Sequence, residues 1–218
     1  MTSRFPSSHA CASLLVLALA ACSGGPDAAE AGPPDARADT PRSGQARDIP
    51  VVAEAFRSAM TPDDNIDSVA AWSAPDGGVW VIATAKATDR LVVYDGHTGQ
   101  TLRTVGGPGT GAGEFDRPNG VAVVDDLVFV VERDNRRVQA LRLPGFTHVT
   151  SFAGEDLAKP YGLWVNPVDA GYELYVTDAY MAGEDAGGED ILPPLSGLDR
   201  RVKRYLVKRD GAGYRAQL

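Results

Sequence analysis

The residues with the clearest potential for chemistry are a lysine in an apolar setting and two neighbouring acids. Lys86 directly follows the apolar run VWVIATA, where lysine is unusual unless its ammonium group reaches solvent or an anion. Asp64 and Asp67 flank the start of a predicted strand, residues 68–72, and aspartates at turns commonly accept hydrogen bonds from their own backbone. Lys86 is therefore a candidate anion-binding residue, and the two acids are open to either a turn role or a binding role.

Other patterns associated with catalysis are weaker. His97 lies in a glycine-flanked turn and His148 starts a predicted strand, and neither accompanies a Ser or Cys in a nucleophile motif. The run GGPGTGAG lacks the Gly-Lys-Ser/Thr ending of a phosphate loop. The insertion 181–199 lacks the alternating ligand spacing of a calcium loop, so we expect a solvated loop there, although it carries four acids, Glu184, Asp185, Glu189 and Asp190.

The elements that must position these residues form a repeat. Three similar segments each begin with arginine, at Arg90, Arg137 and Arg201, and they start 47 and 64 residues apart. Each follows an apolar run, directly or after an insertion. A repeat of roughly 40–50 residues made of short strands is typical of β-propeller blades. The sequence therefore predicts an all-β fold with about three four-stranded blades, part of a larger ring of about six.

We expect four strands in each blade, separated by turns such as Asp76-Gly77-Gly78. Those of the first blade are 68–72, 79–85, 91–94 and 101–105; those of the second are 120–124, 127–132, 138–143 and 148–152; those of the third are 161–165, 172–177, 202–207 and 214–218.

Composition limits the class of partner. The formal net charge is −8, which argues against a nucleic-acid partner and suits a cation-dependent site. The 24 Gly and 15 Pro residues suit a turn-rich all-β domain, which we assign to residues 51–218. Residues 22–50 are rich in Ala, Gly, Pro and Asp without an apolar period, so we predict a disordered tether.

The N-terminus indicates export. Residues 11–21 form an apolar run too short to span a bilayer stably, and residues 1–21 fit a secretory signal. The sequence LAAC ending at Cys22 resembles the bacterial lipobox, which implies lipidation of Cys22 and a membrane anchor in the cell envelope. Ser23 favours the outer membrane by the same resemblance. An ordinary signal cleaved near these small residues is the alternative.

Four segments resemble the β-propeller phytase family. DNIDSVAAW from Asp64 resembles the family's opening run, in which paired aspartates precede Pro-Ala-Ile-Trp, and Lys86 with the following LVVY resembles its Lys-containing strand. DNR ending at Arg136 resembles a Ser-Asn-Arg loop, and Tyr161-Gly162 resembles the start of the third blade. The match covers about residues 63–207, or about half of the family's six-bladed ring.

The resemblance implies a Ca²⁺-dependent phosphomonoester hydrolase acting on inositol hexakisphosphate. Hard cations held by carboxylates offset the charge of such a substrate, and a metal-bound water supplies the attacking oxygen. By resemblance, Asp64 and Asp67 are metal-site residues, whereas Lys86, Arg136 and Tyr161 contact phosphate. The family's second paired aspartate is Ser68 here, and Asp178-Ala179 replaces a basic residue.

Two further expectations concern completeness and an alternative function. Each blade in a repeat fold buries its face against the next, so we expect a longer protein or a partner, with a self-standing three-blade arc as the alternative. The run GEFDRPNGV also resembles the NHL repeat. This second resemblance implies a non-catalytic binding propeller at the cell envelope.

Overall fold

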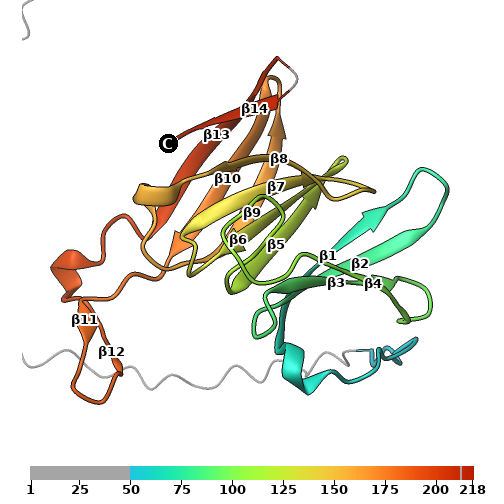
Figure 1. Cartoon of the computed structure of the whole chain (residues 1–218), viewed down its shortest axis with the longest axis horizontal. Helices are drawn as coiled ribbons and strands as arrows, with labels where there is room; N and C mark the ends of the chain where they lie inside the picture. Colours follow the sequence, from blue (N-terminus) through green and yellow to red (C-terminus); the bar gives the residue numbers. More distant parts are fainter. Residues whose placement is uncertain (1–49, 212) are drawn as a thin grey trace, which may run out of the picture. The chain divides into compact units, whose positions relative to one another are not determined.

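Three four-stranded antiparallel sheets follow one another along the chain (Figure 1). The computed structural model describes residues 50–211 and 213–218, so the predicted signal, the tether and Cys22 lie outside the described residues. We call the sheets blades 1, 2 and 3. Their strands are β1 (Ile66–Ser73), β2 (Val79–Ala85), β3 (Arg90–Asp95) and β4 (Thr101–Val105); β5 (Pro118–Val124), β6 (Leu127–Glu132), β7 (Arg137–Arg142) and β8 (Thr147–Phe152); and β9 (Pro160–Val168), β10 (Gly171–Asp178), β13 (Val202–Asp210) and β14 (Gly213–Gln217).

Within each blade the strands pair in the order in which they occur in the chain. This meander confirms the predicted all-β blades of a partial β-propeller. The register also confirms the repeat, because Arg90 opposes Ala85, the last residue of β2, and Arg137 opposes Glu132, the last residue of β6. In blade 3 the Asp178 amide donates to the carbonyl oxygen of Arg201 (2.8 Å).

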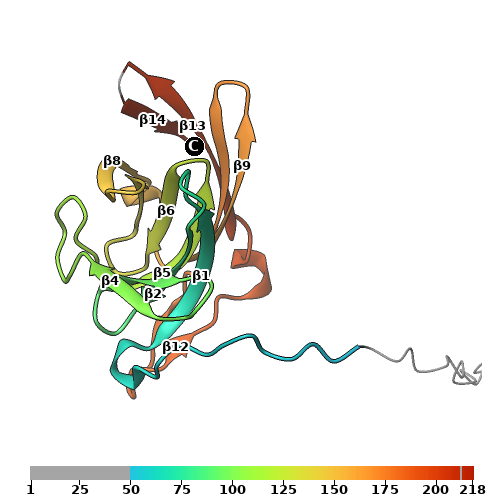
Figure 2. The same ribbon diagram turned by 90° about the vertical axis from the view of Figure 1, so that its right-hand side faces the viewer.

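The core lies between consecutive blades. One cluster joins blades 1 and 2 through side chains such as Ile82 and Val130, and a second joins blades 2 and 3 through Phe129 and Leu174. All four of these side chains are fully buried. The first strands β1, β5 and β9 lie next to one another (Figure 2), so their N-terminal ends share one region of the molecule.

The insertion between β10 and β13 is only partly as predicted. Its four acids are exposed, as expected for a solvated loop. Within it, β11 (Gly183–Glu184) pairs with β12 (Asp190–Ile191), and the sequence pattern did not predict this hairpin. Asp185 organises the turn by accepting hydrogen bonds from the amides of Gly187 (2.8 Å) and Glu189 (2.9 Å).

The remaining elements are three short 3-10 helices, η1 (Pro62–Asp64), η2 (Gly154–Asp156) and η3 (Leu195–Gly197). In the part of the chain that the structure describes, no helix is long and apolar enough to cross a membrane.

One close approach between blades 2 and 3 depends on glycine. A Cβ atom added to Gly120 would lie 2.7 Å from the carbonyl oxygen of Tyr161 and 3.1 Å from the Cα atom of Gly162. Both neighbours are backbone atoms, so strain can be relieved only by moving the two first strands apart.

We therefore expect Gly120→Ala to lower the free energy of unfolding by about 1–3 kcal/mol, the usual cost of overpacking, as measured by urea denaturation. Gly107→Ala is the matched control, because a Cβ atom there meets nothing within 4 Å. Equal stability of the two variants would contradict the close packing of β5 against β9.

Candidate functional site

The first strand of each blade contains a β-bulge near its start. In blade 1 the register shifts between Ile66, opposite Ala85, and Val69, opposite Ala83. Corresponding shifts occur in blade 2 between Pro118 and Val121, and in blade 3 between Pro160 and Leu163. The first bulge residues are therefore equivalent, and they are Asp67, Asn119 and Tyr161. Bulges re-aim side chains and are common beside active sites.

Threonine hydroxyls hold two of these bulges. The amide of Ser68 donates to Oγ1 of Thr84 (3.0 Å), and the amide of Gly162 donates to Oγ1 of Thr177 (2.8 Å). Thr84 Oγ1 in turn donates to the carbonyl oxygen of Asn119 (2.6 Å). This bridge joins the bulges of blades 1 and 2, while the close contact at Gly120 joins those of blades 2 and 3. The three bulges therefore form one continuous site, which we call the bulge site.

Two of the predicted residues meet at the bulge site. Lys86 Nζ lies 3.6 Å from Oδ1 of Asp67, and the side chains are 18% and 20% exposed. At this distance the ions attract each other without a normal hydrogen bond, so the ammonium group keeps its donors for another acceptor. Oδ2 of Asp67 is buried without a hydrogen-bond partner among the described residues.

Asp64 does not join this pair. Its Oδ1 atom accepts hydrogen bonds from Thr88 Oγ1 (2.7 Å) and Arg90 NH2 (2.7 Å), and the residue is buried. The Thr88 hydroxyl, followed by the Arg90 guanidinium, lowers the pKa of Asp64 below its usual value, although burial opposes the effect. Asp64 thus anchors the β2–β3 turn to the residues before β1.

The cation equivalent to Lys86 in blade 2 is Arg133. Both residues directly follow the second strand of their blade, whereas Arg136 is the last residue of its turn, as Asp89 is in blade 1. Arg136 is exposed and has a positive φ of 53°. Because the turn has four residues in both blades, the position equivalent to Lys86 lies immediately after the strand, three residues before Arg136.

Charge near Arg133 is mixed. Its Nε lies 2.6 Å from Oδ1 of Asp134. Nearby, the pKa of Asp116 is raised, mainly by burial and then by the carboxylates of Asp134 and Asp89. The Arg133 amide donates to the carbonyl oxygen of Arg117 (3.0 Å), which brings a second arginine to this end of β5. Arg117 Nε is buried without a partner among the described residues.

Tyr161 occupies the bulge position of blade 3 and is 43% exposed, so its ring is accessible to a ligand. The fully buried Asn119 is a residue that sequence reasoning missed. The predicted strand began one residue later, at 120, and the run GEFDRPNGV indicated only a resemblance to the NHL repeat. The equivalence of Asn119 to Asp67 depends on the register of the sheets.

The described residues do not fit a calcium site. Ca²⁺ takes six to eight oxygen ligands, but Asp64 is engaged by Thr88 and Arg90, and Asp67 is paired with Lys86. Across residues 50–211 and 213–218, no three acids, histidines or cysteines are grouped so as to hold a metal. A calcium site at these acids would need additional ligands and a rearrangement of both ion pairs.

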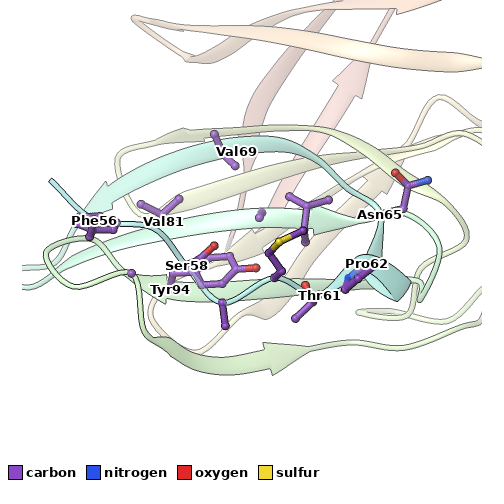
Figure 3. A pocket seen from close by; sticks show the side chains of 13 residues that line it. Phe56, Ser58, Thr61, Pro62, Asn65, Val69, Val81 and Tyr94 are labelled. Carbon is purple, nitrogen blue, oxygen red and sulfur yellow. The ribbon is translucent and has the colours of Figure 1, made fainter. Parts of the chain in front are cut away.

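A separate cavity of about 390 Å³ lies between residues 56–62 and the outer face of blade 1 (Figure 3). Phe56, Val69, Val81 and Tyr94 line it, and the Phe56 ring sits against Gly99. No charged side chain lines this cavity. It therefore lacks groups to hold an anion and is distinct from the bulge site.

Comparisons with known proteins do not assign a family. No protein-family model matches the chain, and no curated protein matches it. A Kuenenia stuttgartiensis hydrazine synthase structure is 15% identical to this chain, with a TM-score of 0.42. The match covers 62% of this chain but only 36% of the hydrazine synthase chain. The computationally designed Ika4 protein is 15% identical with a TM-score of 0.41, covering 77% of this chain and 98% of its own. The PQQ-bound aldose sugar dehydrogenase of Streptomyces coelicolor is 13% identical with a TM-score of 0.37, covering 64% of this chain and 42% of its own. Likeness at this level says nothing about ligand or activity.

The buried Asp64 network leads to a prediction about acid stability. Asp64→Asn should lower the free energy of unfolding at pH 7 by about 1–3 kcal/mol, because Arg90 then loses a charged acceptor. The pKa of Asp64 is lower in the folded chain than in the unfolded chain. The contribution of its carboxylate to the free energy of unfolding is therefore fully present above the unfolded-state pKa, and it is lost as the pH falls through the folded-state pKa. Urea denaturation at pH 7 and pH 3 should therefore show that the stability difference between Asp64→Asn and wild type shrinks in acid.

The control is Asp63→Asn, at an exposed neighbouring acid. A stability difference that grows in acid would contradict the Asp64 network.

Proposed function

We propose that the bulge site binds phosphorylated small molecules of the inositol hexakisphosphate class, as the phosphate-binding part of a phytase-like phosphomonoester hydrolase. The observation that carries the proposal is the repeated placement of a cation, Lys86 or Arg133, directly after the second strand of blades 1 and 2. Each cation follows a strand end that lies opposite the start of a bulged first strand.

The chemistry of these cations suits phosphate oxygens. Hydrogen bonds from ammonium or guanidinium groups to phosphate are charge-assisted, and arginine can form two in parallel. Lys86 is only loosely paired with Asp67, and Tyr161 adds an accessible phenol in blade 3. Because the chain is acidic overall, with a net charge of −8, a polyanion needs such a local set of cations.

Hydrolysis places a further demand on the protein. The resemblance implies Ca²⁺, but the described residues alone do not form its site, so the contribution that we propose for them is substrate binding. The lack of a group of three metal-binding side chains among these residues also favours a second candidate, a binding propeller without catalysis. The predicted lipid anchor at Cys22 would hold either form at the cell envelope.

Binding and turnover by the 218-residue chain separate these functions. We expect isothermal titration calorimetry to detect binding of inositol hexakisphosphate. Inositol hexasulfate, which has similar charge but no phosphate ester, measures how much of that binding is purely electrostatic. Phosphate release is then measured with Ca²⁺ and with a chelator. Calcium-dependent release supports the hydrolase, whereas binding without release supports the non-catalytic propeller. Absence of binding would contradict the proposed function.

The two cations at equivalent positions, Lys86 and Arg133, should matter more to binding than Arg136. We expect Lys86→Met and Arg133→Gln each to raise the Kd for inositol hexakisphosphate by about tenfold, corresponding to one lost charge-assisted contact. Arg136→Gln should change the Kd less, because Arg136 lies at the other end of the turn. Arg215→Gln, in an exposed pair on β14, is the charge-matched control. An equal effect of all four substitutions would indicate nonspecific electrostatics.

A further inference from the structure

Asn119 is a buried amide without hydrogen-bond partners. The residue is fully buried, and neither its Oδ1 nor its Nδ2 atom has a partner among the described residues. Its backbone is well held, because its carbonyl oxygen accepts the hydroxyl of Thr84 (2.6 Å). The lack of partners therefore concerns the side chain and not a poorly placed segment.

Stability does not explain an asparagine at this position. A buried polar group left without a partner lowers stability, whereas an apolar residue of similar size avoids that cost. The residues around it in β5, Pro118, Gly120 and Val121, are themselves buried and carry no polar side chain. Unsatisfied polar groups in otherwise well-packed regions are expected at functional sites.

The position of Asn119 relates this amide to a ligand. It is equivalent to Asp67 in blade 1 and Tyr161 in blade 3, which stand at the same bulge position. A further buried polar atom at the bulge site, Oδ2 of Asp67, also has no partner among the described residues. An unpartnered carboxylate oxygen on β1 and an unpartnered amide on β5 thus stand on adjacent first strands, which the Thr84 bridge holds together.

We propose that Asn119 is a second ligand-binding residue of blade 2 beside Arg133, and that its amide hydrogen-bonds oxygen atoms of the phosphorylated small molecule at the bulge site. This inference rests on the proposed function. Because the amide is enclosed in the ligand-free chain, the contact forms as the ligand enters and neighbouring side chains yield. Hydrogen bonds to the ligand then offset the free-energy cost of burying the unpaired amide.

Replacing the amide by an apolar group of similar size tests this role. We expect Asn119→Leu to be at least as stable as wild type in urea denaturation, yet to raise the Kd for inositol hexakisphosphate by about tenfold or more in calorimetry. Asn166→Leu makes the same chemical change on β9 outside the bulge, and should leave the Kd unchanged. If Asn119→Leu does not fold, Asn119→Ala provides the same comparison without the risk of overpacking.

The outcomes distinguish this inference from the function on which it rests. Wild-type binding together with an unchanged Kd for the Asn119 variant would overturn the ligand role and leave the proposed function intact. A large loss of stability with unchanged binding would instead assign the amide to internal structure, also against the proposal. If wild type itself does not bind, the proposed function fails first.

Discussion

The structure depends on the burial of the facing sides of consecutive sheets against each other. Every blade is a thin meander, so its apolar side chains leave water only when another layer covers them. Ile82 and Val130 meet between blades 1 and 2, and Phe129 and Leu174 meet between blades 2 and 3. At about 1.5–3 kcal/mol for each fully buried large apolar side chain, this contact outweighs any single hydrogen bond in the chain. It also forces the first strands to lie close together.

The first strands approach each other closely near their starts, where Gly120 lies against the backbone of Tyr161. Each first strand bulges at the same position. The bulges turn Asp67, Asn119 and Tyr161 out of the regular alternation. Thr84 links two of the bulges by hydrogen bonds.

Charge is distributed between structural and binding roles. Some acids are fully committed to one cation: Asp64 holds Arg90, and the fully buried Glu132 holds Arg137 at 2.6 Å. These pairs fasten turns and strand ends within a blade. The looser Asp67–Lys86 pair and the unpaired Asn119 amide differ, since both retain hydrogen-bonding capacity. This difference separates residues that stabilise a blade from the residues that we propose bind a ligand.

The blade strands were predictable because their apolar alternation and turn residues are local features. All three first strands begin earlier than predicted, at Ile66 instead of 68, at Pro118 instead of 120 and at Pro160 instead of 161. The bulge explains the discrepancy, since an extra residue interrupts the period of two on which strand prediction relies. The same effect hid Asn119, which has no local signal of its own.

The sequence by itself determined the repeat and the four-stranded blades, because spacing and residue type are properties of the chain. A family resemblance suggested Asp67, Lys86 and Tyr161 as candidate site residues. Only the tertiary structure decided which charges pair with one another. It placed Asp64 with Arg90, identified Arg133 as the counterpart of Lys86, and aligned Asn119 with Asp67. The physical reason is that pairing and burial depend on strand register and on contacts between blades, and neither can be obtained from the spacing of residues within one blade.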